Sequence, residues 1–189
     1  MFENIRADLV RRRLAYKVRA GDQSFFHKYI KANLELGAIA QLVFRYGNWA
    51  VNLRIPVVRQ ILYGVYWILN MGVLLGTGVN IQSRCKIGKG FIVHNFSCIF
   101  IWTTSMGENC TVNQGVTIGS IKGSTVSPQI GNNVFFGSGC KVLGPVKIGN
   151  NVIIAANSLV ITDVPDNCTV IGVPARIVSR DAKSEYLKV

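Results

Sequence analysis

The chain has 189 residues, of which 49% are hydrophobic, and it carries a formal net charge of +12. That length supports one or two domains with a real core. No nucleic-acid-binding module can be read despite the basic balance, and the chain lacks the P-loop, G-x-S-x-G and G-x-G-x-x-G motifs of kinase, hydrolase and dinucleotide chemistry. Its charged start, Met1–Arg6, has no apolar stretch, so no secretory signal is expected there.

Charge is distributed unevenly along the chain. Residues 1–60 hold eleven Lys or Arg and four Asp or Glu, whereas Glu108 is the only carboxylate between Gly37 and Thr162. A surface with so few carboxylates favours an anionic ligand, such as a phosphorylated cofactor or acceptor, or an anionic membrane face.

Residues 1–76 are predicted to form a basic helical region. The Arg11–Arg13 run lies on an early helix, Gly21–Ser24 marks a break, and a second helical run extends from Phe25 to about Asn52. Pro56 is well placed to open another helix, because proline is tolerated in a first turn.

The most hydrophobic stretch of the chain is Val57–Leu75, whose nineteen residues would just span a bilayer. Arg59, Gln60 and Asn70 interrupt it. We expect a buried helix packed against the following domain, with an interfacial membrane helix as the alternative.

From residue 77 onwards an apolar residue recurs every six positions, with one extra residue after the fourth. The series is Ile81, Ile87, Val93, Ile99, Met106, Val112, Ile118, Ile130, Phe136, Val142, Ile148, Ile154 and Val160. A period of six held this long predicts a parallel β-helix, in which six residues make one flat side and eighteen make one coil. The apolar residue and the one four later should point inward, and Gly, Asn and Asp should fill the corners.

The repeat region is predicted to run from 77 to 178, with one loop. Gly119–Gln129 has no repeat character although Ile118 and Ile130 keep the phase, so residues 119–129 are expected to project as a loop that carries function. Residues 179–189 form a polar tail.

Five cysteines are present without a CxxC pair. Cys85, Cys110 and Cys140 each lie four places after a repeat residue, where an inward side chain is expected, and Cys98 and Cys168 show no pairing signature. We expect reduced thiols and a cytoplasmic protein.

His94 is the only histidine of the repeat region and follows the inward Val93. An imidazole can act as a base near neutral pH, whereas His27, in the helical region, is expected to be incidental. One coil of eighteen residues plus the inserted residue, which is placed near Ser105, leads from His94 to Asn113. Asn113 is therefore expected to stack close to His94. Asn113 and Gln114 would orient the imidazole or bind an acceptor hydroxyl, or simply be polar corner residues. With one histidine in the coils, no metal site is expected.

Several short motifs together resemble the hexapeptide-repeat acyltransferases over about 100 residues, and within them the serine acetyltransferase-like branch. The matching segments are Val79–Ile81, Ile87–Gly90, His94, Asn113–Gly119, Gly137–Gly139, Val164–Pro165 and Gly172–Val178. The resemblance implies a left-handed parallel β-helix with a helical N-terminal region, a homotrimer, and acetyl-CoA bound as acetyl donor in the groove between adjacent coils.

The resemblance also implies roles for individual residues. His94 would be the catalytic base, assisted by Asn113. Backbone groups would hold the pantetheine arm and stabilise the oxyanion, and cations near the C-terminus would meet the CoA phosphates. The cofactor-binding positions so implied are Gly119, Gly137, Ser138, Ala155, Ala156 and Arg176, with Arg180 and Lys183 as further candidates.

Departures from the family pattern affect the acceptor. Serine acetyltransferases carry acidic residues or histidine where this chain has Asn80, Val93, Trp102 and Ser127. The carboxylates that would hold a serine ammonium are therefore missing, and Phe96, Phe100 and Trp102 suit a sugar ring instead.

The acceptor site is therefore predicted to comprise Asn80, Phe96, Trp102 and Gln114. We expect transfer of acetyl to a sugar hydroxyl in capsule or exopolysaccharide biosynthesis, with a saccharide or lipid-linked saccharide as partner and contact with the inner face of the bacterial membrane as an option. The alternatives are a serine O-acetyltransferase with an altered acceptor site, transfer of a longer acyl chain, and a catalytically idle binding or assembly module.

Overall fold

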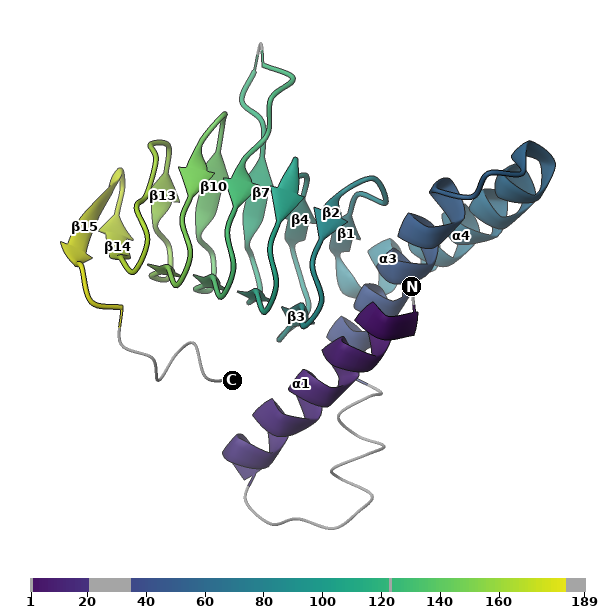
Figure 1. Cartoon of the computed structure of the whole chain (residues 1–189), viewed down its shortest axis with the longest axis horizontal. Helices are drawn as coiled ribbons and strands as arrows, with labels where there is room; N and C mark the ends of the chain where they lie inside the picture. The colour runs from purple at the N-terminus through teal and green to yellow at the C-terminus, as the bar shows by residue number, and fades with distance from the viewer. Residues whose placement is uncertain (1, 21–34, 123, 183–189) are drawn as a thin grey trace.

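The computed structural model describes residues 2–20, 35–122 and 124–182. Among these residues, three helices lie at one end of a stack of short strands that leads away from them to the C-terminal hairpin (Figure 1). The helices are α1 (Phe2–Ala20), α3 (Leu36–Val51) and α4 (Pro56–Thr77). The predicted break at Gly21 and the start of the second run at Phe25, like His27, lie outside the described residues.

The stack is a parallel β-helix of three sheets, as the six-residue period predicts. The first sheet has the order β1-β4-β7-β10-β13, the second β11-β8-β5-β2, and the third β15-β14-β12-β9-β6-β3. Their bounds are β1 Val79–Ile81, β2 Lys86–Ile87, β3 Ile92–Val93, β4 Ile99–Ile101, β5 Ser105–Met106, β6 Thr111–Val112, β7 Thr117–Gly119, β8 Gln129–Ile130, β9 Phe135–Phe136, β10 Lys141–Leu143, β11 Lys147–Ile148, β12 Ile153–Ile154, β13 Leu159–Val160, β14 Thr169–Gly172 and β15 Ala175–Ser179.

Strand registers confirm the predicted eighteen-residue coil. Lys141 pairs with Leu159 and Phe135 with Ile153, each eighteen residues on. The corners are turned by asparagines with positive φ, among them Asn133 (55°) and Asn151 (54°), a conformation that asparagine tolerates better than most residues.

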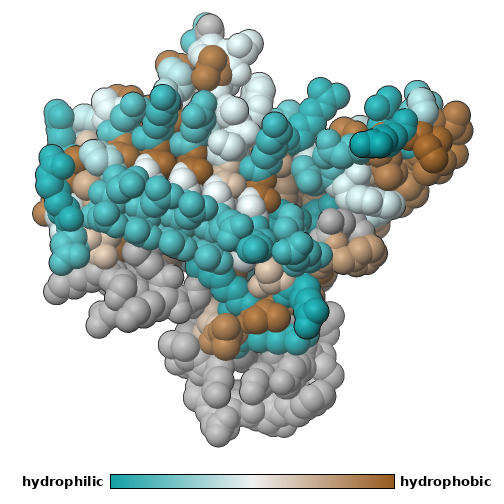
Figure 2. All heavy atoms as spheres, viewed as in Figure 1, coloured by the Kyte–Doolittle hydropathy of each residue, from teal (hydrophilic) through white to brown (hydrophobic). Residues whose placement is uncertain are grey.

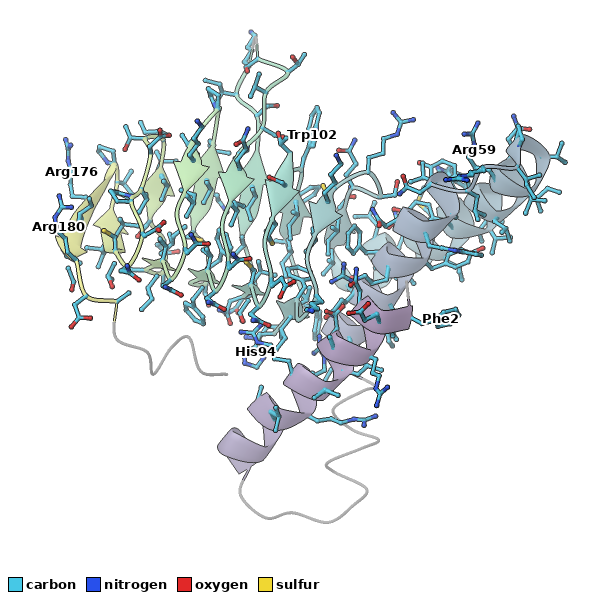
Figure 3. The ribbon with its side chains drawn as sticks, viewed as in Figure 1. Phe2, Arg59, His94, Trp102, Arg176 and Arg180 are labelled. Carbon is cyan, nitrogen blue, oxygen red and sulfur yellow. The ribbon has the colours of Figure 1, made fainter. Side chains whose placement is uncertain are left out.

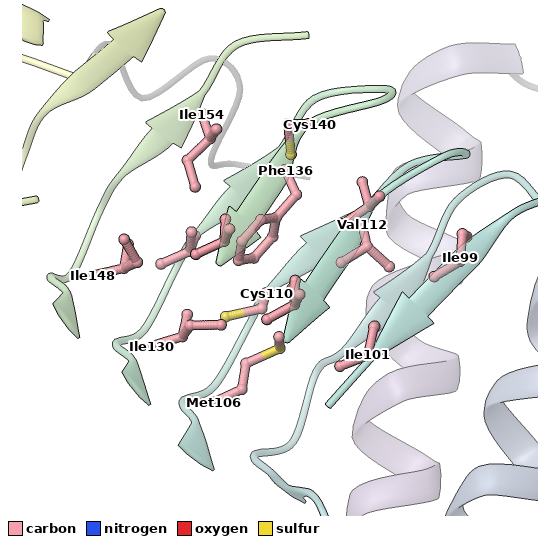
Figure 4. Packing of buried hydrophobic residues seen from close by; sticks show 14 of the residues in the cluster. Ile99, Ile101, Met106, Cys110, Val112, Ile130, Phe136, Cys140, Ile148 and Ile154 are labelled. Atoms are coloured by element: carbon pink, nitrogen blue, oxygen red, sulfur yellow. The ribbon is translucent and has the colours of Figure 1, made fainter. Parts of the chain in front are cut away.

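Inward side chains fill the middle of the β-helix (Figure 4). Val112, Phe136 and Ile154 are fully buried in successive coils of the third sheet. Cys110 and Cys140 are buried beside them as predicted, and all five cysteines are free. Burial raises the pKa of each of these two thiols to about 12.

The first full coil departs from the regular repeat directly after His94. Val93 pairs with Val112 and Ile101 with Ile118, so eight residues in the first coil span what six span in the next. Ser97 (φ 95°) and Cys98 (φ 53°) turn this longer corner. The prediction that one residue is inserted near Ser105 is therefore wrong: two extra residues lie in the corner after His94, and the following side is one residue shorter.

Buried charged side chains join the N-terminal helices to this first coil. Asp8 of α1 forms an ion pair of 2.8 Å with Arg45 of α3, and both side chains are almost wholly buried. Asp8 also accepts a hydrogen bond from the Phe91 N–H, and Arg45 donates to the Ile87 carbonyl. The helices thereby satisfy backbone groups at the open end of the β-helix.

The helix α4 lies differently from the prediction. It opens with Pro56 as expected and ends at Gly78, whose left-handed φ of 65° lets its N–H close on the Leu74 carbonyl. It packs on α3 through Tyr66 and Val73 rather than being buried against the β-helix, and its outward apolar side chains stay exposed (Figure 2). By length and composition it is the one helix among the described residues that would suit a membrane span.

The predicted loop projects from the coils between β7 and β8 (Figure 1). Its outer residues Gly119 and Gln129 belong to those strands, so the loop proper is 120–128, of which 123 is not described. The antiparallel pair β14 and β15 closes the stack. The predicted tail begins within β15, and residues 183–189, including Lys183, lie outside the described part.

Candidate active site along one edge of the β-helix

Most of the predicted site residues lie on one edge of the β-helix, at the corner that follows each strand of the third sheet. Because Val93, Val112, Phe136 and Ile154 are paired in register, the residues that follow them form a column. We call this column, together with the next residue of each corner, the His94 edge. It consists of His94 and Asn95, Asn113 and Gln114, Gly137 and Ser138, and Ala155 and Ala156.

His94 lies at the end of the column nearest the helices (Figure 3). Its N–H donates to the Val112 carbonyl at 2.9 Å, and the carbonyl of the preceding Val93 accepts from Arg12 at 3.1 Å. The backbone on both sides of the imidazole is therefore fixed, while the side chain is partly exposed. Asn95 donates to the Gln114 side chain at 2.8 Å beside it.

Asn113 lies one coil from His94, as predicted, but its side chain is engaged elsewhere. It is buried, and its amide group donates to the Phe136 carbonyl at 2.9 Å. Only the amide oxygen remains to accept a hydrogen bond from the imidazole. The contact fits the corner-residue interpretation, and the catalytic assignment of Asn113 stays a prediction.

The four cofactor positions on the His94 edge fall into two kinds. Gly137 and Ala155 donate their N–H groups to the Ile154 and Val170 carbonyls of the next coil, at 2.8 and 2.9 Å. In the described part of the chain, the N–H groups of Ser138 and Ala156 donate no hydrogen bond. These two outward groups lie one coil apart and are the donors available to a ligand lying along the edge.

Gly137 is required at its position because the next coil passes very close. A Cβ there would lie 2.5 Å from the Ala156 nitrogen. Any side chain would push the two coils apart and displace the Ala156 N–H, so the edge depends on glycine here.

A cavity of about 430 Å³ opens on the first sheet. Strand β4 of this sheet follows the corner that contains His94. Asn80, Phe100, Trp102, Gly119 and Leu143 line the cavity, so three of the predicted residues meet there. We call it the aromatic cavity. Phe96 does not line it and lies exposed in the corner after His94.

None of the described carboxylates lines the aromatic cavity. Val93, where serine acetyltransferases carry an acidic residue, points into the core and is fully buried. Ser127 is buried and its hydroxyl lies 2.9 Å from that of Thr104. Glu108 belongs to a different corner, between β5 and β6, and lies 3.8 Å from Lys89. Of the four positions where serine acetyltransferases carry acidic residues or histidine, none therefore holds a carboxylate in this chain.

Arg176 and Arg180 lie at the far end of the stack from His94 (Figure 3). Five strand-to-strand steps, from β3 to β15, separate the two ends of the third sheet. At about 4.8 Å a step this amounts to about 24 Å. An extended ligand along the His94 edge would thus have its anionic end near the arginines and its reactive end at the imidazole.

The sequence interpretation missed Arg12. It was counted with its neighbours as part of a basic helix face, yet it is buried and donates to Gln41 and to the Val93 carbonyl. Burial lowers the pKa of the Arg12 guanidinium. The available signal is the spacing of Asp8, Arg12 and Ala15, which share one buried helix face.

Comparison with known proteins agrees with this geometry. Residues 127–162 match the bacterial transferase hexapeptide (six repeats) family. A serine acetyltransferase from Synechococcus elongatus is 37% identical over 147 residues, which cover 76% of this chain and 57% of the relative. The chain thus spans little more than half of that protein.

Solved structures extend the similarity to nearly the whole chain. A serine acetyltransferase from Neisseria gonorrhoeae, in complex with serine, is 27% identical with a TM-score of 0.72, over 94% of this chain and 68% of that one. A serine acetyltransferase in complex with CoA is 26% identical with a TM-score of 0.74, over 93% and 70%. The similarity of the chain to the serine acetyltransferases therefore covers both its helices and its β-helix.

Proposed function

We propose that the protein is an acetyl-CoA-dependent O-acetyltransferase and that L-serine is its acceptor. The observation that carries the proposal is the His94 edge, where one partly exposed imidazole and the N–H groups of Ser138 and Ala156 lie on a single line. This arrangement occurs in a chain similar to serine acetyltransferases, including structures in complex with CoA and with serine.

The reaction follows from these groups. The His94 imidazole takes the proton from the acceptor hydroxyl as that oxygen attacks the thioester carbonyl of acetyl-CoA. The carbonyl oxygen becomes an oxyanion, which outward N–H groups stabilise. When the tetrahedral intermediate collapses, the C–S bond breaks and the imidazolium returns its proton to the CoA sulfur. The products are the acetyl ester and free CoA.

The comparisons favour serine over the sugar predicted from the sequence. They match serine acetyltransferases, and none of the relatives described above is a polysaccharide O-acetyltransferase. With serine in the aromatic cavity, the ammonium group would meet the amide oxygen of Asn80 in place of a carboxylate, and because His94 does not line this cavity, the base that acts on this serine would be the His94 of a neighbouring copy of the chain. We expect this to weaken serine binding, because a neutral acceptor stabilises an ammonium group less than a charged one.

A sugar hydroxyl is the second candidate acceptor, and one observation favours it. Phe100 and Trp102 are 49% and 48% exposed beside the aromatic cavity, which has no carboxylate lining. Exposed aromatic side chains offer apolar contact area for a sugar ring. A saccharide does not need the missing cation partner.

The test is release of free CoA from acetyl-CoA by the purified full chain, with L-serine compared against nucleotide sugars and lipid-linked saccharides. Turnover with serine supports the proposal. Turnover with a saccharide alone replaces the acceptor but keeps the acetyltransferase. Absence of both turnover and acetyl-CoA binding would overturn the enzymatic proposal and leave the idle-module interpretation.

A further inference from the structure

A second and larger cavity lies away from the His94 edge. It is open to solvent, has a volume of about 950 Å³ and is bordered by α3, α4 and the strands β2 and β5 of the second sheet. Its lining includes three cationic side chains, Arg59, Arg84 and Lys86, and we call it the basic pocket. His94 follows the third sheet, so the two sites lie on different sides of the β-helix, as their separation in Figure 3 shows.

The three cations have no acidic partner within the described residues. None of them forms an ion pair or a side-chain hydrogen bond with another described residue, in contrast to Arg12 and Arg45, which are buried and paired. The sequence gives the reason: no Asp or Glu occurs from residue 36 to residue 107, and every residue that lines the pocket lies in that segment. Three like charges around one cavity repel each other, and an anion would relieve that repulsion.

The polar groups between the cations suit an anionic oxygen cluster. Two guanidinium groups offer paired N–H donors that match phosphate oxygens, and the lysine adds a point charge. The side chains of Asn52, Gln60 and Tyr63 supply further polar atoms on the same lining. The volume exceeds what one phosphate group needs, so the ligand carries an organic part as well.

We propose that the basic pocket binds the phosphate or diphosphate group of an organic ligand. This inference goes beyond the proposed function, because neither His94 nor the cofactor positions take part in it. Two sources would supply the same chemistry: a soluble phosphorylated metabolite, or the headgroup of a lipid.

The lipid source is suggested by the surface next to the pocket. Arg59 is the only charged residue of α4 and lines the pocket. The outward side chains of the same helix are apolar and exposed, including Ile61 (63%), Ile68 (68%) and Leu75 (81%). A headgroup held by Arg59 would have its acyl chains beside this apolar surface.

The soluble source is tested by titrating inorganic pyrophosphate into the full chain in a calorimeter at low salt. We expect binding by the wild type and a loss of affinity of about tenfold or more in Arg84→Gln and in Lys86→Gln, because each removes a charge-assisted contact. Lys147→Gln is the matched control. Lys147 occupies the same place in β11 that Lys86 occupies in β2, on the same sheet but outside the pocket.

The lipid source is tested by sedimentation with vesicles of phosphatidylcholine, with and without phosphatidylglycerol. Binding to the anionic vesicles that falls in Lys86→Gln and not in Lys147→Gln supports the pocket with a lipid headgroup as ligand. If neither pyrophosphate nor anionic vesicles bind, or if Lys86→Gln and Lys147→Gln bind equally, the proposal is wrong. Removing one of three mutually repelling charges should not lower the melting temperature, so misfolding is checked by a thermal melt.

Discussion

At the level of single residues, the proposed chemistry depends on one imidazole whose backbone is held from two sides. The neighbouring coil fixes the His94 N–H and Arg12 fixes the Val93 carbonyl. A side chain on such a fixed backbone can keep a constant position relative to donors in the adjacent coils. The base and the donors therefore need no loop movement to come into line.

Replacing His94 by alanine should lower kcat about 10²- to 10⁴-fold, the usual contribution of a positioned general base. The side chain is partly exposed, so the fold should be retained. The measurement is CoA release, with circular dichroism and a thermal melt as controls for folding. Undiminished turnover in a folded variant would remove His94 from the mechanism.

Replacing Asn80 by aspartate should improve serine as an acceptor. Asn80 lines the aromatic cavity, which has no carboxylate, and the new charge would pair with the serine ammonium group. We expect KM for serine to fall about tenfold, with KM for acetyl-CoA unchanged. If KM for serine does not fall, or if both constants move together, the cavity is not the serine site.

The cysteines should differ sharply in reactivity. Cys98 is exposed, whereas the other four are buried, and burial raises the pKa of Cys110 and of Cys140 to about 12. A thiol with a raised pKa stays protonated at neutral pH, and the thiolate is the reactive form. Titration of the native protein with a thiol reagent at pH 7 should modify one thiol quickly. Modification of Cys98→Ser at the same rate would contradict this.

At the level of elements, the helices α1 and α3 close the first coil by burying an ion pair. Asp8→Asn should destabilise the fold by about 3–5 kcal/mol, because Arg45 would keep its charge without a buried partner. Urea unfolding measures this. The matched control is Glu3→Gln, whose pairing with Lys89 spans 3.8 Å between exposed side chains and should contribute less than about 1 kcal/mol. Equal losses in both variants would show that the buried pair has no special role.

The repeat elements could be predicted because their signal is the spacing of inward residues, which the fold repeats thirteen times. Other features leave no such pattern. The corner after His94 is turned by Ser97 and Cys98, two residue types that rarely adopt positive φ, so neither composition nor spacing marks it. The inward Arg12 was missed because a charged residue is normally assigned to solvent, and here tertiary hydrogen bonds override that tendency.

The placement of α4 shows a further limit of sequence patterns. Its apolar length is evident from the sequence, but apolar residues occur on all sides of the helix, so the pattern does not say which side packs. The structure buries Tyr66, Val73 and Thr77, half-buries Leu62, Asn70 and Leu74, and leaves the other side chains of the helix exposed. In the site, the register-related residues of the His94 edge were predictable from the period, whereas the basic pocket depends on where α4 lies relative to β2, which no repeat encodes.

At the level of the whole molecule, we propose that the chain assembles as a homotrimer. The aromatic cavity is bordered by half-exposed Phe100 and Trp102, with Ile121 and Val126 of the projecting loop also about half exposed. A neighbouring copy would cover these apolar side chains. Light scattering after gel filtration should give three times 20.8 kDa, about 62 kDa. A mass of 20.8 kDa at working concentration would exclude the trimer.

The regular registers also divide the stack into steps of constant height, and we call one such step a division. Every strand spacing is about 4.8 Å, and one division corresponds to eighteen residues, as between Lys141 and Leu159. Duplicating residues 141–158 would therefore add one division and move Arg176 away from His94 by that single step. The distance between the two ends of the His94 edge can change only in whole divisions. The number of coils therefore determines the length of an extended ligand that contacts both ends.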